Sequence, residues 1–104
     1  MKMSHVEHLK LLGKSKHKAE LLRKCPNSLI KCVCECALNI LKGNVPLTTR
    51  QKNKLAAHKR TLRKLADRKV ALFKKRRLLV QKGDGFLSFL IPAAVSVLSS
   101  LFHG

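Results

Sequence analysis

Acidic and aromatic residues are scarce in this chain. Its 104 residues include five Asp or Glu against 23 Lys or Arg, which gives a net charge of +18 with His neutral. The acids are scattered, so the paired carboxylates that most acid–base and metal-dependent mechanisms need are lacking. Trp and Tyr are absent and Phe occurs four times, which leaves little for stacking on single-stranded bases. We therefore expect no enzyme and no cofactor, but a protein that binds a polyanion.

The N-terminus lacks the features of a secretory signal. The first twelve residues contain Glu7 and two His, and no long apolar run. Four cysteines without such a signal indicate reduced thiols in a reducing compartment. Because the length allows only one small domain, large enzyme folds are excluded. We expect a protein of the cytosol or nucleus.

The charge is unevenly distributed along the chain. Residues 1–49 carry nine Lys or Arg and three Glu, residues 50–82 carry fourteen Lys or Arg and one Asp, and residues 83–104 carry one Asp and no Lys or Arg. These composition shifts predict an N-terminal helical module (1–49), a basic helical DNA-binding region (50–82) and an apolar C-terminal tail after a Gly-Asp-Gly hinge (83–104).

Local signals predict four helices before the basic run ends. Ser4 and Glu7 have capping-box spacing for a helix that ends near residue 13, and Ser15 is a candidate cap for a second helix that ends before Pro26. The clearest helix spans about residues 28–42, and its apolar face is formed by Leu29, Ile30, Val33, Ala37, Ile40 and Leu41.

Stop and start signals separate this helix from the next. Gly43 and Asn44 supply a left-handed stop, Pro46 follows, and Thr48 with Gln51 has capping-box spacing for a helix over residues 48–67. The two helices would form a helix-turn-helix-like hairpin. We predict an all-α fold, in which this module is followed by a basic helical extension and a separate apolar tail. A sequence-specific helix-turn-helix regulator is one alternative, although only Gln51 and Asn53 suit adenine readout in this helix.

The basic region is expected to contact phosphates. With a single acid among fourteen cations it has almost no internal pairing, so it should repel itself until a polyanion binds. If it were one helix, it would span roughly 50 Å at about 1.5 Å per residue. The predicted DNA-binding residues are Arg50, Lys52, Lys54, Lys59, Arg60, Arg63, Lys64, Arg68, Lys69, Lys74, Lys75, Arg76 and Arg77.

The cysteines and histidines do not form a known zinc motif. Cys32, Cys34 and Cys36 are spaced C-x-C-x-C rather than C-x-x-C. On a helix Cys34 would point away from the other two, so we expect the cysteines to be small apolar helix residues. The alternative is a metal site, whose candidate ligands are Cys25, Cys32, Cys34, Cys36, His5, His8, His17 and His58. We expect no catalytic residue.

The C-terminal segment from Phe86 to Phe102 contains no charged residue. It allows three interpretations: a marginal membrane span, a core helix of the same domain, or a self-association or membrane-active tail, which we favour. Pro92 should break or kink a helix there. The predicted membrane or self-association residues are Phe86, Leu87, Phe89, Leu90, Ile91, Val95, Val97, Leu98, Leu101 and Phe102.

Two sequence segments resemble a known protein family. The run Cys34–Leu47 (C-E-C-A-L-N-I-L-K-G-N-V-P-L), a Lys/Arg-rich stretch, and then Lys82–Leu87 (K-G-D-G-F-L) with an apolar end resemble the small basic protein of Polinton/Maverick transposons and adintoviruses. In layout the last third also resembles the adenovirus core protein X precursor, through Gly85-Phe86-Leu87 and Leu90-Ile91-Pro92. The basic stretch departs from that precursor by mixing Lys and Leu with Arg.

The resemblance implies a virion core protein that neutralises and condenses double-stranded DNA. It implies no catalytic residue. RNA stays open as the polyanion, and a capsid or core protein, a membrane and a second copy of the chain stay open as further partners. The competing function is that of a membrane-active minor capsid protein that uses the apolar tail.

Overall fold

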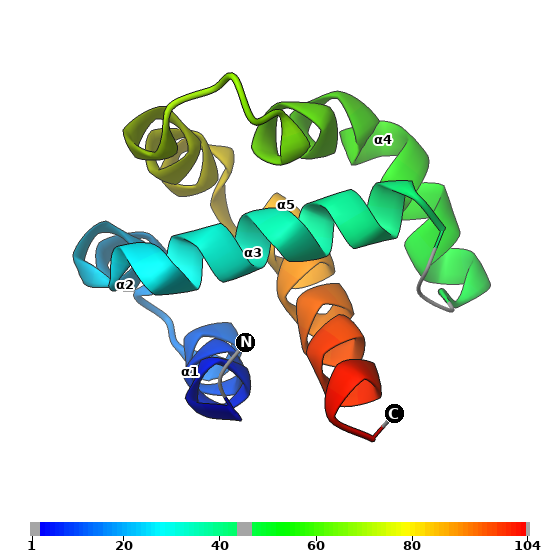
Figure 1. Ribbon diagram of the computed structural model, residues 1–104, viewed down its shortest axis with the longest axis horizontal. Helices are drawn as coiled ribbons and strands as arrows, with labels where there is room; N and C mark the ends of the chain where they lie inside the picture. Colours follow the sequence, from blue (N-terminus) through cyan, green and yellow to red (C-terminus); the bar gives the residue numbers. More distant parts are fainter. Residues whose placement is uncertain (1–2, 44–46, 104) are drawn as a thin grey trace.

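All secondary structure in the described residues is helical. The computed structural model describes residues 3–43 and 47–103, apart from the side chains of residues 3, 4, 84 and 100–103. The helices are α1 (Met3–Lys14), α2 (Lys18–Lys24), α3 (Asn27–Leu41), α4 (Thr49–Ala66) and α5 (Leu72–His103) (Figure 1). They pack into a body of 30 × 28 × 28 Å. The predicted all-α class is confirmed.

The predicted helix boundaries around α3 and α4 agree with the structure. Pro26 precedes α3, and Gly43 ends it with a φ of 74°, a conformation that glycine adopts readily. The Thr48 hydroxyl accepts a hydrogen bond from the Gln51 amide at 3.2 Å, and the Gln51 side chain accepts one from the Thr48 amide at 3.0 Å. These two bonds are the predicted capping box. The parts of these signals assigned to Asn44 and Pro46, and to the side chain of Ser4, lie outside the described residues.

The cap predicted for α2 is wrong in detail. His17 is the N-cap residue, and its side chain makes no capping hydrogen bond. The Ser15 hydroxyl instead accepts from the amide of His17 at 2.9 Å, in the link before the helix.

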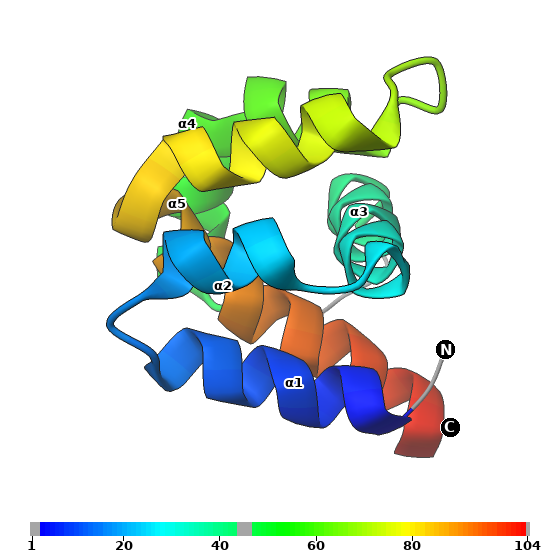
Figure 2. The same ribbon diagram turned by 90° about the vertical axis from the view of Figure 1, so that its left-hand side faces the viewer.

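Helix α5 is bent at Gly83. This glycine has φ 75° and ψ −170°, outside the helical region, so the helix changes direction there. The bend divides α5 into a basic half (residues 72–82) and an apolar half (residues 84–103). In Figure 2 the basic half lies beside α4 on one side of the molecule, and the apolar half runs beside α1 on the opposite side. Helices α2 and α3 lie between these two layers.

The apolar half of α5 is the central core helix rather than a separate tail. Its side chains bury against α1, α3 and α4, and they belong to one hydrophobic cluster with residues of every other helix. Of the predicted membrane or self-association residues, the fully buried ones are Phe86, Leu87, Phe89, Leu90, Ile91, Val97 and Leu98, and Val95 is half-buried. Leu101 and Phe102 lie outside the described side chains. The separate tail predicted from the sequence is therefore wrong, because this segment supplies apolar surface that the other helices need to bury.

Contacts along the apolar half show how closely the helices approach. A Cβ atom placed on Gly13 of α1 would lie 3.1 Å from Cγ2 of Ile91, so glycine permits this crossing. On the α3 side, the Cys36 thiol faces the carbonyl oxygen of Ala94, with Sγ and O separated by 3.9 Å. The His58 ring of α4 stacks on Phe89 and meets Phe86 edge-on, at centroid distances of 5.7 and 5.1 Å.

Pro92 does not break α5. It lies inside the helix, and the non-helical backbone is at Gly83. Proline in a helix interior costs about 3 kcal/mol. Here its exposed ring follows buried Ile91 and precedes buried Ala93 and Ala94. Burial of these neighbours offsets the missing backbone hydrogen bond, so the predicted break is wrong.

The basic region does not extend away from the body either. It forms α4, a turn over residues 67–71, and the basic half of α5. The Asp67 carboxylate accepts a hydrogen bond from the Lys69 amide at 2.9 Å in that turn. Buried Leu62, Leu65 and Leu79 fix both helices to the core. The single 50 Å rod considered from the sequence is thus replaced by two helices folded side by side.

Candidate nucleic-acid interface

The cations of residues 50–82 gather on one side of the molecule. Helix α4 and the basic half of α5 form that side in both ribbon views (Figures 1 and 2). Most of the predicted DNA-binding residues are exposed there; these are Arg50, Lys52, Lys54, Lys59, Arg60, Arg63, Lys64, Arg68, Lys69, Lys74 and Arg77. We call this set the basic face.

Helical periodicity explains why the basic face is continuous over α4. Leu62 and Leu65 are buried and Leu55 is half-buried, and these leucines lie on the stripe that meets the core. The cations occupy the remaining positions of the helix and point to solvent. The sequence also predicts Ala56 and Ala66 on this apolar stripe, but Ala56 is exposed and Ala66 is half-buried, so the leucines carry the contact with the core.

The basic face is electrostatically unpaired. Among the described residues an ion pair joins Lys24 to Glu20 at 3.3 Å, and none involves a cation of residues 50–82. Arg77 instead lies over the ring of Phe73, with 5.9 Å from its Cζ to the ring centroid. Because opposite charges are lacking, the field of these cations is balanced only by solvent ions.

Arg76 belongs to the fold rather than to the basic face. Its guanidinium donates hydrogen bonds to the carbonyl oxygens of Leu22 at 2.6 Å and Cys25 at 2.7 Å, and to the side-chain oxygen of Asn27 at 2.6 Å. A cation at a helix C-terminus satisfies carbonyls that have no helical partner. Arg76 therefore holds the end of α2 to α5, and most of its contacts are with the protein's own carbonyl groups.

Lys75 is also absent from the basic face. Its side chain is 9% exposed, on the face of α5 that carries Leu72 and Leu79. Residues three and four apart share a helix face, so the position of Lys75 between these leucines explains its burial. The four cations Lys74 to Arg77, which look equivalent in the sequence, thus have different environments.

The polar side chains proposed for base readout are only partly free. The Gln51 side-chain oxygen is engaged by the Thr48 amide in the capping box. Asn53 is exposed on α4. One free amide side chain offers little for sequence-specific recognition.

The cysteines are buried free thiols, as the sequence predicts for small apolar residues. Burial raises the pKa of Cys34 to about 11. Burial also raises the pKa of Cys25, against a smaller opposing effect of Arg76. A hydrogen bond between Cys32 and Cys36 lowers the pKa of Cys32 and raises that of Cys36.

The candidate metal ligands do not converge. Within the described ranges, no three His, Cys, Asp or Glu side chains lie close enough to hold a metal ion. His58 packs on phenylalanine rings, and Cys34 and Cys36 face different neighbours of α3, the cavity beside Lys75 and the apolar half of α5. In the same part of the chain, no helix combines the length and hydrophobicity needed to cross a bilayer.

Sequence reasoning missed two features of this side of the molecule. It did not indicate that Lys75 is buried and that Arg76 is hydrogen-bonded to the end of α2, and it did not connect Lys31 of α3 with the basic region. The spacing of Leu72, Lys75 and Leu79 is a signal that could have revealed the buried lysine. Comparison of the chain with protein-family models, with curated proteins and with solved structures finds no match in any of the three.

Proposed function

We propose that this protein binds double-stranded DNA without sequence preference and condenses it, through contacts between the basic face and backbone phosphates. The observation that carries the proposal is the exposure of eleven cations on two adjoining helices and the turn between them, with no ion pair to any described residue. Neutralising phosphates releases condensed counterions, and this release dominates non-specific DNA affinity. The resemblance to basic proteins of Polinton/Maverick elements supports a role in a virion or virus-like core.

Condensation of DNA is consistent with a small protein whose positive charge extends beyond the basic face. Exposed lysines also occur in and after α1, at Lys10, Lys14 and Lys16, and helix α1 lies on the side of the molecule opposite α4 and the basic half of α5 (Figure 2). Cations on two sides allow one molecule to touch two duplex segments. Bound copies would then reduce the repulsion between neighbouring DNA strands.

The membrane-active alternative loses its main support. The apolar residues that would enter a bilayer are already buried against the protein's own helices, so releasing them would require unfolding of the core. The structure adds no support for a sequence-specific helix-turn-helix regulator, because the side-chain oxygen of Gln51, a candidate for base readout, accepts a hydrogen bond in the cap of α4. RNA is the second polyanion whose affinity for the protein has to be compared with that of DNA.

The test is binding of the full chain to random-sequence duplex DNA by fluorescence anisotropy across a range of salt concentrations. Contact with about six to ten phosphates predicts a log–log slope of about −5 to −9. Duplex RNA, anionic liposomes and a panel of defined duplexes serve as competitors. A slope shallower than about −2, displacement by liposomes, or a preference of about a thousandfold for one duplex would contradict the proposal.

A matched pair of triple variants locates the interface. Arg60→Gln, Arg63→Gln and Lys64→Gln together remove three charges from α4, whereas Lys10→Gln, Lys14→Gln and Lys16→Gln remove three exposed charges from α1 and the link after it. The α4 variant should make the slope shallower by about 0.9 for each phosphate that is no longer neutralised. Equal decreases in both variants would show that DNA responds to overall charge rather than to the basic face. Light scattering by DNA at saturating protein tests condensation separately.

A further inference from the structure

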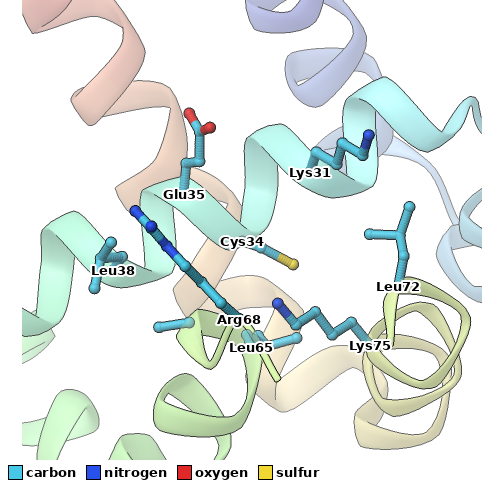
Figure 3. Close-up of a pocket in the computed structure, with 9 residues that line it drawn as sticks. Lys31, Cys34, Glu35, Leu38, Leu65, Arg68, Leu72 and Lys75 are labelled. Carbon is cyan, nitrogen blue, oxygen red and sulfur yellow. The ribbon is translucent and has the colours of Figure 1, made fainter. Parts of the chain in front are cut away.

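A cavity of about 210 Å³ opens beside the basic face. It lies between α3, the turn after α4 and the basic half of α5. Its charged lining residues are Lys31, Glu35, Arg68 and Lys75, and its apolar walls include Leu38, Leu65 and Leu72. In Figure 3 the ammonium end of Lys75 and the sulfur of Cys34 point into the same space, with Lys31 and Arg68 on either side of Cys34.

Lys75 lacks an anionic partner at this cavity. Its side chain is about nine-tenths buried, and it forms neither an ion pair nor a hydrogen bond with any described residue. The stem of this lysine is packed in the protein, whereas its ammonium group opens to the cavity and has no counter-charge among the described residues. An anion in the opening beside Lys75 would neutralise that charge at a site partly shielded from water.

The protein's own acidic groups do not supply that charge. Cys34 is an ionisable group of the cavity lining, and burial raises its pKa to about 11, even though Lys75 acts in the opposite direction. Cys34 is consequently a neutral thiol near pH 7. Glu35 is exposed, and its carboxylate points away from Lys75 in Figure 3.

We propose that this cavity binds a phosphate group, held by Lys75, Arg68 and Lys31. The three cations come from separate segments and surround one space, which suits an anion with several acceptor oxygens. With Glu35 included, the lining carries a net charge of +2, close in magnitude to the charge of a phosphate group near neutral pH, about −1.5 to −2. The leucine walls lower the local dielectric and strengthen each charge-assisted hydrogen bond.

The cavity volume agrees with this ligand. A volume of about 210 Å³ far exceeds the roughly 10–15 Å³ of cavity space that one water needs, so a tetrahedral oxyanion fits together with bridging waters. The phosphate group has two sources, free inorganic phosphate and a DNA backbone phosphate. The second source rests on the proposed function, whereas binding of inorganic phosphate does not.

The experiment titrates the full chain with sodium phosphate, with ionic strength kept constant by sodium chloride, and follows amide resonances by NMR. We expect saturable shifts at Cys34, Arg68 and Lys75. Lys75→Met should weaken phosphate binding at least tenfold, whereas Lys42→Met, at an exposed lysine outside both the cavity lining and the basic face, should leave it unchanged. Thermal unfolding of both variants controls for folding, and Lys75→Met should be no less stable than the parent because it removes a charge that has no counter-charge among the described residues. A non-saturable titration, or equal binding by the Lys75→Met variant, overturns the proposal.

DNA binding by the same variants identifies the source of the phosphate group. If a backbone phosphate enters the cavity, Lys75→Met should make the salt slope shallower by about 0.9. If the slope is unchanged while the phosphate titration saturates, the cavity binds free phosphate. If the chain does not bind DNA but the phosphate titration saturates, the proposed function fails and the phosphate site stands.

Discussion

Arg76 donates a hydrogen bond to the carbonyl oxygen of Leu22 at 2.6 Å, across 54 positions of sequence. The same guanidinium reaches Cys25 and Asn27, so one side chain joins the end of α2, the start of α3 and the basic half of α5. An arginine within a basic run thus stabilises the fold.

The first prediction concerns this guanidinium. Arg76→Gln should lower the free energy of unfolding by about 1.5–3 kcal/mol, the usual range for hydrogen bonds to a charged group. Arg77→Gln is the matched control, because Arg77 is exposed and its removal should change stability by less than about 0.5 kcal/mol. Urea denaturation followed by circular dichroism measures both. Equal effects of the two substitutions would show that the Arg76 network does not stabilise the protein.

The second prediction tests the position of the apolar half of α5. Leu90 is fully buried, and Leu90→Ala should cost about 2–5 kcal/mol through reduced burial and the cavity left behind. Ser96→Ala, at an exposed position of the same helix, should change stability little. Thermal unfolding of the full chain provides the readout. If residues 86–98 were a separate tail, Leu90→Ala would leave the unfolding of the other helices unchanged.

Two glycines of α5 should respond in opposite directions to alanine. Gly83 has φ 75°, and nothing lies within 4 Å of a Cβ placed there. Gly83→Ala should therefore destabilise by about 1–3 kcal/mol through backbone strain alone, because a positive φ with an extended ψ is a conformation restricted essentially to glycine. Gly85 lies in helical backbone with open space around its Cβ position, and Gly85→Ala should stabilise by about 0.4–1 kcal/mol. The denaturation midpoint of each variant is compared with that of the parent protein. Stabilisation by Gly83→Ala would contradict the bend at this residue.

The fourth prediction follows from the buried Cys34 thiol. Its pKa rises from 9.0 to about 11 on folding, so the unfolded chain loses this proton at a lower pH than the native protein. The contribution to stability is constant below about pH 9 and is lost as the pH rises towards 11. Cys34→Ala should therefore show a smaller drop in unfolding free energy than the parent between about pH 8 and pH 10.5. Equal drops would mean that the thiol ionises in the native state as readily as in the unfolded chain.

The sequence predicted the local structure well where short-range signals act alone. Pro26, Gly43 and the Thr48–Gln51 pair define the ends of α3 and α4 by steric and hydrogen-bonding effects within a few residues. The buried stripe of α4 follows from the spacing of Leu62 and Leu65. Each of these features depends on the chain near it, so no knowledge of the tertiary arrangement was needed.

Tertiary partners decided the features that the sequence did not predict. A helix that is apolar on most of its surface is typical of both a membrane-active segment and a central core helix. Residues 86–98 form a core helix because the other helices pack around them. Charge composition also gave Lys74 and Lys75 the same expected role, whereas their positions around α5 expose one and bury the other. The place of Lys31 at the cavity required the packing of α3 against both α4 and α5.

The central position of the apolar half of α5 determines the order in which this chain can fold. Helix α1 packs against Ile91, and α3 packs against Ala94. Until residues 86–98 have been synthesised, these two helices therefore have no apolar partner at those contacts. The core is closed by contacts between helices far apart in sequence, such as α1 and α5. Long-range contacts slow folding relative to bundles dominated by neighbouring helices. The basic region can therefore reach its packed position only after the apolar segment that follows it has been synthesised, because Leu62, Leu65 and Leu79 share one core with residues 86–98.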